Sequence, residues 1–301
     1  MNGIGRSHDM KPVGIITDSN SGISQADAEK MDIKVLPMPF YFGEECYYEN
    51  VSLTRDDFFA RQGNGENVST SQPSPESVMN IWREGLEEYE EIIYMPMSSG
   101  LSGSCDTAKM LANEDEFAGK VYVVDNGRVS TPAIRALMDA KEMVKEGYKA
   151  ADIRNMLEAA KEDMSIYIAV ETLEFLKKGG RITPATAALG TVLNIKPILS
   201  LGVENLDTFA KCRGMKKART IMLEAIKNDI ETKYKSFLEK NELYMLAASS
   251  ADEETTREWV EEIKEFFPGM EVLSGNLALS ICCHTGPGAL GVGFSCKPSR
   301  I

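Results

Sequence analysis

The first half of the chain alternates apolar runs with segments of helical periodicity, and this alternation constrains the fold more than any other feature. Buried strands are predicted at residues 13–18, 92–95 and 121–125, and helices at 75–88 (capped by Ser74), from 104 onward, at 132–146 and at 150–163. Strands that alternate with helices form a mainly parallel sheet with helices on its faces. Ligands collect at the carboxyl ends of such strands, where we expect Asp18, Ser98 and Asp125.

The second half has less regular spacing and predicts an α+β unit with a mixed or antiparallel sheet. Its predicted strands are residues 165–170, 197–201, 243–247 and 277–281, and its long helices are residues 215–234 and 254–267. One segment of the first half, residues 34–42, is strand-like throughout, and its prolines suit a sheet edge.

A chain of 301 residues is longer than one average domain, so two domains are expected. The predicted fold class is α/β, with a mainly parallel N-terminal domain and an α+β C-terminal domain. We expect a loose tail over residues 1–12, the N-terminal domain over 13–164 and the C-terminal domain over 165–301.

Charge and composition exclude several classes of protein. The formal net charge of −13 argues against nucleic-acid binding, which requires a basic face, and against attraction to anionic lipid surfaces. No apolar run is long enough for a transmembrane helix, and the first ten residues lack the apolar core of a secretory signal. The six cysteines show no CxxC spacing, which predicts reduced thiols, a cytoplasmic protein and no zinc site.

The segment Met97–Ser104 is the clearest ligand-binding signal in the residues alone. It places hydroxyl and glycine residues between a predicted strand and a predicted helix, where unpaired backbone N–H groups suit a phosphate or a carboxylate. Ser98 and Ser99 are the candidate anion ligands, and a plain turn with a helix cap is the alternative. A second hydroxyl cluster, Ser69–Ser74, either caps the next helix or faces the same anion.

His284 is one of only two histidines, and the other, His8, lies in the predicted tail. Because His284 adjoins a predicted strand end, a structural and a functional role are both open. The following residues, Gly286–Gly291, match GxGxxG, but too few residues remain for a strand–helix–strand unit. A dinucleotide site is therefore excluded.

Two clusters of cations are candidate contacts for a phosphorylated group or an acidic partner. Arg181 lies in Lys177–Ile182, where the paired glycines predict a helix C-cap, and Arg213 lies in Lys211–Arg219. The alternative is a helix cap with solvated cations for the first cluster and a solvated helix face for the second. No Ser/His/Asp spacing, HExxH motif, P-loop or GxSxG elbow occurs, so the residues describe an anion-binding α/β protein without a nucleophile, metal or cofactor.

Taken together, short segments of the chain resemble the DegV family of bacterial fatty-acid-binding proteins. They occur in family order from about residue 13 to residue 298. The matching segments are Ile15–Ser19, Val35–Pro37, Thr70–Ser74, Ser98–Gly103, Leu176–Ile182, Lys196–Leu199 and His284–Gly288. Each segment alone is a weak signal, and the ordered set is specific.

The resemblance implies two α/β domains with a long-chain fatty acid (C14–C18, for example palmitate) between them, and no catalysis by the chain itself. It maps carboxylate ligands onto Thr70 and Ser99, with Ser98 as the less favoured serine, and places His284 near the same head group. It also implies a partner, an ATP-dependent fatty-acid kinase that makes an acyl phosphate on the bound chain, so that the protein acts as an acyl carrier for lipid metabolism. By analogy, Arg181 and Arg213 contact that kinase or the new phosphate.

The chain departs from the family pattern at Asn126, where a serine or threonine is usual, and at Thr131–Ala133, which opens a helix without glycine. Two other functions stay open. One is a serine esterase or phosphotransferase that uses Ser99 and His284. The other is a regulatory interaction module in which bound lipid is a passive filler.

Overall fold

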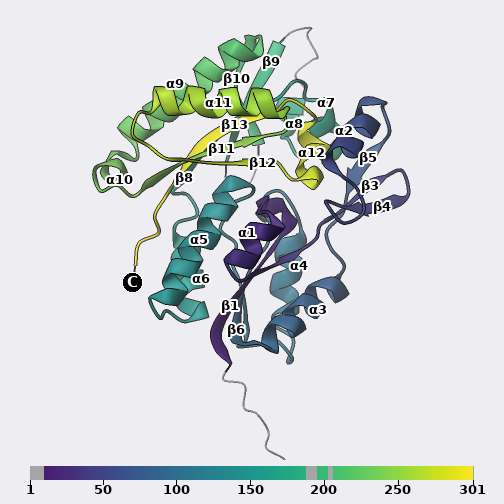
Figure 1. Cartoon of the computed structure of the whole chain (residues 1–301), viewed down its shortest axis with the longest axis vertical. Coiled ribbons are helices and arrows are strands. Elements are labelled where there is room, and N and C mark those ends of the chain that lie inside the picture. Colours follow the sequence, from purple (N-terminus) through teal and green to yellow (C-terminus); the bar gives the residue numbers. More distant parts are fainter. Residues whose placement is uncertain (1–9, 188–194, 203–205, 301) are drawn as a thin grey trace, which may run out of the picture.

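The first of three sheets in the computed structural model, which describes residues 10–187, 195–202 and 206–300, is parallel throughout (Figure 1). Its strand order is β2-β1-β6-β7, with bounds Ile33–Leu36, Lys11–Asp18, Tyr89–Met95 and Val121–Val123. Helices α1 (Gln25–Lys30), α5 (Thr131–Lys145) and α6 (Ala150–Ala159) cover one face, and α3 (Pro75–Leu86) and α4 (Ser104–Leu111) cover the other. Because both faces are covered, β1 is buried continuously from Val13 to Asp18.

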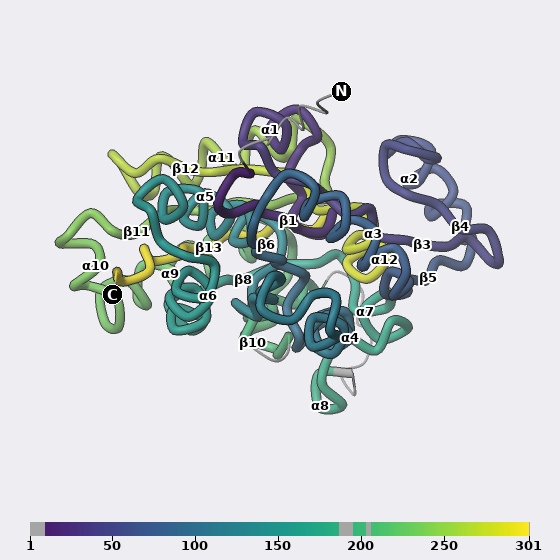
Figure 2. The backbone as a smooth tube through the Cα atoms, turned by 90° about the horizontal axis from the view of Figure 1, so that it is seen from below, coloured from purple at the N-terminus to yellow at the C-terminus, as the bar shows by residue number. Residues whose placement is uncertain are grey.

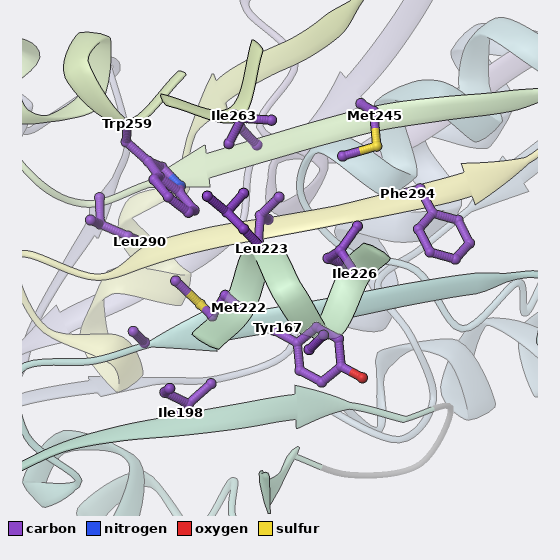
Figure 3. Packing of buried hydrophobic residues seen from close by; sticks show 14 of the residues in the cluster. Tyr167, Ile198, Met222, Leu223, Ile226, Met245, Trp259, Ile263, Leu290 and Phe294 are labelled. Carbon is purple, nitrogen blue, oxygen red and sulfur yellow. The ribbon is translucent and has the colours of Figure 1, made fainter. Parts of the chain in front are cut away.

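The second sheet has six strands in the order β10-β9-β8-β13-β11-β12 and is mixed, since only β11 and β12 run parallel. The strand bounds in that order are Leu206–Arg213, Ile195–Leu201, Met164–Ala169, Leu290–Cys296, Leu243–Ser249 and Val272–Asn276. Helices α9 (Met215–Thr232) and α11 (Glu253–Phe266) pack on one face around Trp259, Leu223 and Phe294 (Figure 3). The opposite face of this sheet is turned toward the first sheet and α5.

A third, small sheet belongs to the first half of the sequence but packs against the second. Its strands β4 (Glu45–Tyr48), β3 (Pro39–Phe42) and β5 (Val68–Thr70) are antiparallel and carry α2 (Arg55–Gly63). Their phenylalanines share a core with α7 (Glu174–Gly179) and α12 (Leu279–Thr285), beside which they lie in both views (Figures 1 and 2). Arg55 donates from its guanidinium to the carbonyl oxygens of Leu277 and Ser249, 2.8 and 3.3 Å away.

The predicted α/β class, with a parallel first sheet and a mixed second sheet, is confirmed. Two predicted elements are wrong. Residues 34–42 form two strands in different sheets, because Pro37, which has no N–H to donate, directly follows the last residue of β2, and Pro39 begins β3. Residues 277–281 lead into helix α12 and form no strand; an apolar run this short suits a buried helix equally well.

The boundary near residue 164 stays a prediction, although β8, the first strand of the second sheet, begins there. Of the predicted tail, residues 1–9 lie outside the described residues, and Lys11 begins β1. Two short helices, α8 (Pro184–Ala187) and α10 (Lys235–Glu239), complete the elements. Within the described ranges, no helix combines the length and the apolar character needed to cross a membrane.

Candidate functional site

A polar pocket and an apolar cavity lie next to each other between the first and second sheets. The polar pocket has an empty volume of about 570 Å³, its opening to solvent included, and the side chains of Thr70, Ser102, Arg181 and His284 line it. The apolar cavity has an empty volume of about 640 Å³, space open to solvent included, and extends over the face of the second sheet. Five residues line both spaces, which makes them continuous: Met97, Leu101, Leu206, Ile281 and Thr285.

The apolar cavity runs across several strands of the second sheet. Leu201 and Leu206 line it on β9 and β10, and Leu246 lines it on β11. Four strand spacings separate β10 from β11 in the order of this sheet, which corresponds to roughly 19 Å. An apolar space of this breadth with a polar pocket beside it suits a ligand with an extended hydrocarbon chain and a polar head.

Thr70 and His284 meet in the polar pocket, as expected for members of one site. Thr70 Oγ1 and His284 Nε2 are 2.8 Å apart, although 214 positions separate them in sequence. Burial, with a smaller effect of the nearby Arg181 charge, lowers the pKa of His284 to about 4. The imidazole is therefore neutral near pH 7 and can donate from Nε2 to Thr70, which leaves the threonine hydroxyl hydrogen free for a ligand.

The turn after β6 is held in place by two carboxylates at the ends of β1 and β7. Asp18 Oδ2 accepts from the Met97 N–H at 2.8 Å, and Asp125 Oδ2 accepts from the Ser99 hydroxyl at 2.7 Å. Burial raises the pKa of Asp18 to about 6 against its backbone hydrogen bonds. Burial acts in the same direction on Asp125, but hydrogen bonds from Lys161 and Ser99 prevail and lower its pKa to about 2.

The four serines of the Met97–Ser104 segment have different surroundings. Ser98 is buried, Ser99 is bound to Asp125, and neither is among the described residues that line the polar pocket. Ser102 lines it instead, and its Oγ accepts from the Ser104 N–H at 3.2 Å, so its own hydrogen remains available for a ligand. Sequence analysis missed Ser102, because the local pattern does not show which serine turns inward.

Arg181 and Arg213 do not share one location. Arg181 lines the polar pocket, and its guanidinium donates to the carbonyl of Gly179. Arg213 is exposed at the far end of β10, whose opposite end, Leu206, lines the pocket. The strand between them spans roughly 20 Å, so the two arginines cannot contact the same small group.

The two catalytic side chains of the esterase hypothesis are not brought together. The Ser99 hydroxyl donates to Asp125, while His284 Nε2 faces Thr70. The neighbouring thiols are not activated either, since burial raises the pKa of Cys282 to about 12. Over the described residues, no cluster of three or more His, Cys, Asp or Glu side chains could hold a metal ion.

This fold and pocket define a class of α/β protein with an apolar cavity and an adjoining hydroxyl-lined pocket between two sheets. Comparison with known proteins identifies the family. The family model for DegV matches residues 12–297, and the chain belongs to the DegV family.

Solved relatives agree with this assignment over nearly the whole chain. A fatty-acid-binding DegV protein from Thermus thermophilus is 31% identical, with a TM-score of 0.83 over 95% of this chain and 99% of its own. DegV of Bacillus subtilis, described as a fatty-acid-binding protein, is 26% identical, with a TM-score of 0.81 over 95% and 100%. A stearic-acid-binding protein from Eubacterium ventriosum, 23% identical over 95% and 98%, shares the fold with a TM-score of 0.84. Among curated sequences, a DegV domain-containing protein of Clostridium acetobutylicum is 27% identical over 94% of this chain and 98% of its own.

Proposed function

We propose that this protein binds one long-chain fatty acid, with the carboxylate in the polar pocket and the acyl chain in the apolar cavity. The observation that carries the proposal is the continuity of the two spaces, which gives a single ligand one polar and one apolar environment. Fatty-acid binding by the Thermus and Bacillus relatives supports it. Acids of C14–C18, palmitate among them, suit the roughly 19 Å breadth of the cavity.

Thr70, Ser102 and His284 form the proposed head-group site. Thr70 and Ser102 donate their hydroxyl hydrogens to the carboxylate, and His284 orients Thr70 by donating to it from Nε2. Charge-assisted hydrogen bonds of this kind satisfy a buried carboxylate. In this arrangement Ser98 and Ser99 act indirectly on the carboxylate. The hydrogen bond from Ser99 to Asp125 fixes the turn that carries Ser102.

We further propose that the protein presents this carboxylate to an ATP-dependent fatty-acid kinase in the cytoplasm and carries the resulting acyl phosphate, without catalysis of its own. Arg181 borders the head group and would contact a new phosphate there. Arg213, exposed and roughly 20 Å away along β10, would contact only the partner. The separation of Ser99 from His284 disfavours the esterase alternative.

Native mass spectrometry of gently purified protein tests the binding proposal. A bound acid of C14–C18 is expected, and protein that is consistently empty and also refuses added oleate would contradict it. The kinase proposal has its own test, because Arg213→Glu should leave fatty-acid binding intact while it abolishes acyl phosphate formation with the cognate kinase. If no kinase acts on the loaded wild-type protein, the regulatory-module alternative is favoured.

A further inference from the structure

Strand β13 forms the floor of the apolar cavity, and its two faces differ sharply. Leu290, Val292 and Phe294 belong to the core beneath α9 and α11, where Figure 3 shows Leu290 and Phe294. The alternate residues, Gly291 and Gly293, face the other way and line the cavity. The strand is thus apolar and bulky on one face, and on the other it is bare of side chains at Gly291 and Gly293.

The neighbouring strands build walls on both sides of this bare strip. The strand register places Gly291 between Ile168 of β8 and Ala248 of β11. Gly293 lies in the same way between Ile166 and Leu246. All four flanking residues line the cavity, and cross-strand neighbours project to the same face of a sheet. The missing side chains therefore leave a trough over Gly291 and Gly293 that is one strand wide, and a ligand that spans the cavity from β10 to β11 crosses β13 there.

Gly291 is the point in this trough where a side chain would enter free space. A Cβ atom there would lie 3.4 Å from the Ala248 carbonyl oxygen and 4.0 Å from Ile168 Cγ1, and no atom of the opposite layer would come closer than these. At Gly293, by contrast, a Cβ atom would lie 2.6 Å from the Ser165 carbonyl oxygen. A substitution at 293 must shift the backbone of the neighbouring strand, whereas one at 291 only fills the cavity.

The backbone at Gly291 cannot retreat from an added side chain. The strand is paired with both β8 and β11 at this residue. From the other face, the Trp259 Nε1–H donates to the Gly291 carbonyl oxygen at 3.0 Å, and Trp259 is fully buried. Any side chain at position 291 therefore projects into the space above the sheet.

We propose that a single unbranched acyl chain crosses β13 at this trough and that Gly291 is a specificity-determining residue for its length. This inference rests on the proposed fatty-acid binding and adds the path of the chain. A methyl group at position 291 takes the place of about one methylene of a chain that passes over it. Loss of one buried methylene lowers the affinity about fourfold. Chains that extend further past position 291 lose more affinity, because more of the chain is displaced.

Titration of decanoate, palmitate and the methyl-branched phytanate into delipidated wild-type, Gly291→Ala and Gly63→Ala protein tests the proposal. Gly63 is exposed on α2 with open space around a Cβ atom, so its variant is a matched control. In Gly291→Ala, the ratio of palmitate to decanoate affinity should fall fourfold or more, and Gly63→Ala should leave it unchanged. Adding Ile168→Val, which removes a methyl group from the trough wall, should restore at least half of the loss. Phytanate should bind the wild type at least tenfold more weakly than palmitate.

An unchanged affinity ratio in a folded Gly291→Ala protein would overturn the path over Gly291, as would phytanate binding as tight as palmitate binding. Failure of the wild type to bind any of the three acids would instead overturn the proposed function itself. Circular dichroism of each variant shows whether the protein is folded. Should Gly291→Ala not fold, Ala248→Gly provides the opposite test, since it widens the same row of the trough. It is expected to improve phytanate binding relative to palmitate, and an unchanged ratio would again overturn the path.

Discussion

Gly179 and Gly180 lie side by side at the end of α7, and glycine is favoured at each position for a different reason. A Cβ atom at 179 would overlap the Nδ1 atom of His284 and lie 2.6 Å from its Cε1. In Gly179→Ala the imidazole must therefore turn away, which breaks its 2.8 Å hydrogen bond to Thr70. Overpacking costs about 1–3 kcal/mol and the lost hydrogen bond about 1 kcal/mol, so the free energy of unfolding should fall by about 2–4 kcal/mol.

The same substitution should weaken palmitate binding tenfold or more. A hydrogen bond to a charged group contributes about 1.5–3 kcal/mol, and a displaced His284 no longer orients the Thr70 hydroxyl toward the carboxylate. Calorimetric titration of delipidated protein measures the affinity, and urea unfolding measures the stability.

Gly180→Ala is the matched control. Gly180 has a φ of 67° in the left-handed region, and nothing lies within 4 Å of a Cβ atom there. Its variant should lose about 1 kcal/mol of stability through backbone strain and bind palmitate as the wild type does. Equal affinities in the two variants would refute the reasoning, because the pairing of Thr70 with His284 would then contribute nothing to the head-group site.

Three further outcomes are expected. Ser102→Ala should weaken palmitate binding about tenfold, measured by calorimetry, since it removes a proposed donor to the carboxylate. Ser99→Ala should weaken it less. A larger effect of Ser99→Ala would instead indicate that Ser99 is the carboxylate ligand. Asp125→Asn should lower stability, because Lys161 and the Ser99 hydroxyl lose a charged acceptor; urea unfolding with no change would contradict this. The pKa of His284 is lower in the folded than in the unfolded protein, so its contribution to the free energy of unfolding is complete above pH 6.5 and is lost as the pH falls to 4. The pKa of Asp18 is higher in the folded protein, so Asp18 lowers the free energy of unfolding above pH 6, and this penalty disappears as the pH falls from 6 to 3.8. From pH 7 to 4, the free energy of unfolding of His284→Asn should therefore rise by about 3 kcal/mol relative to wild type, and that of Asp18→Asn should fall by about 2 kcal/mol. Parallel pH profiles would contradict both assignments.

Local sequence patterns predicted those parts of the fold that local physics determines. Ser74 caps α3 as expected, because its hydroxyl accepts from the Ser77 N–H three residues on. The inward serine was missed because the choice between Ser99 and Ser102 depends on Asp125, which is distant in sequence. The packing of the small sheet on α12 was missed for the same reason, since its core forms from side chains more than 200 positions apart. Thr70 and His284 were paired only through the family resemblance; neither residue carries a local signal for the other.

The division of binding free energy between tail and head explains how so acidic a chain accommodates an anionic ligand in the proposed complex. Burial of a palmitate-sized chain contributes roughly 0.8 kcal/mol per methylene, or about 10 kcal/mol before ordering costs. The head-group site then needs only to replace the hydrogen bonds that the carboxylate loses to water. Burial keeps His284 neutral at pH 7, so the site meets the carboxylate with oriented hydroxyl groups and one nearby cation, Arg181. Selectivity for a carboxylate therefore depends on the geometry of Thr70 and Ser102, and the net charge of −13 acts only at a distance, where salt screens it.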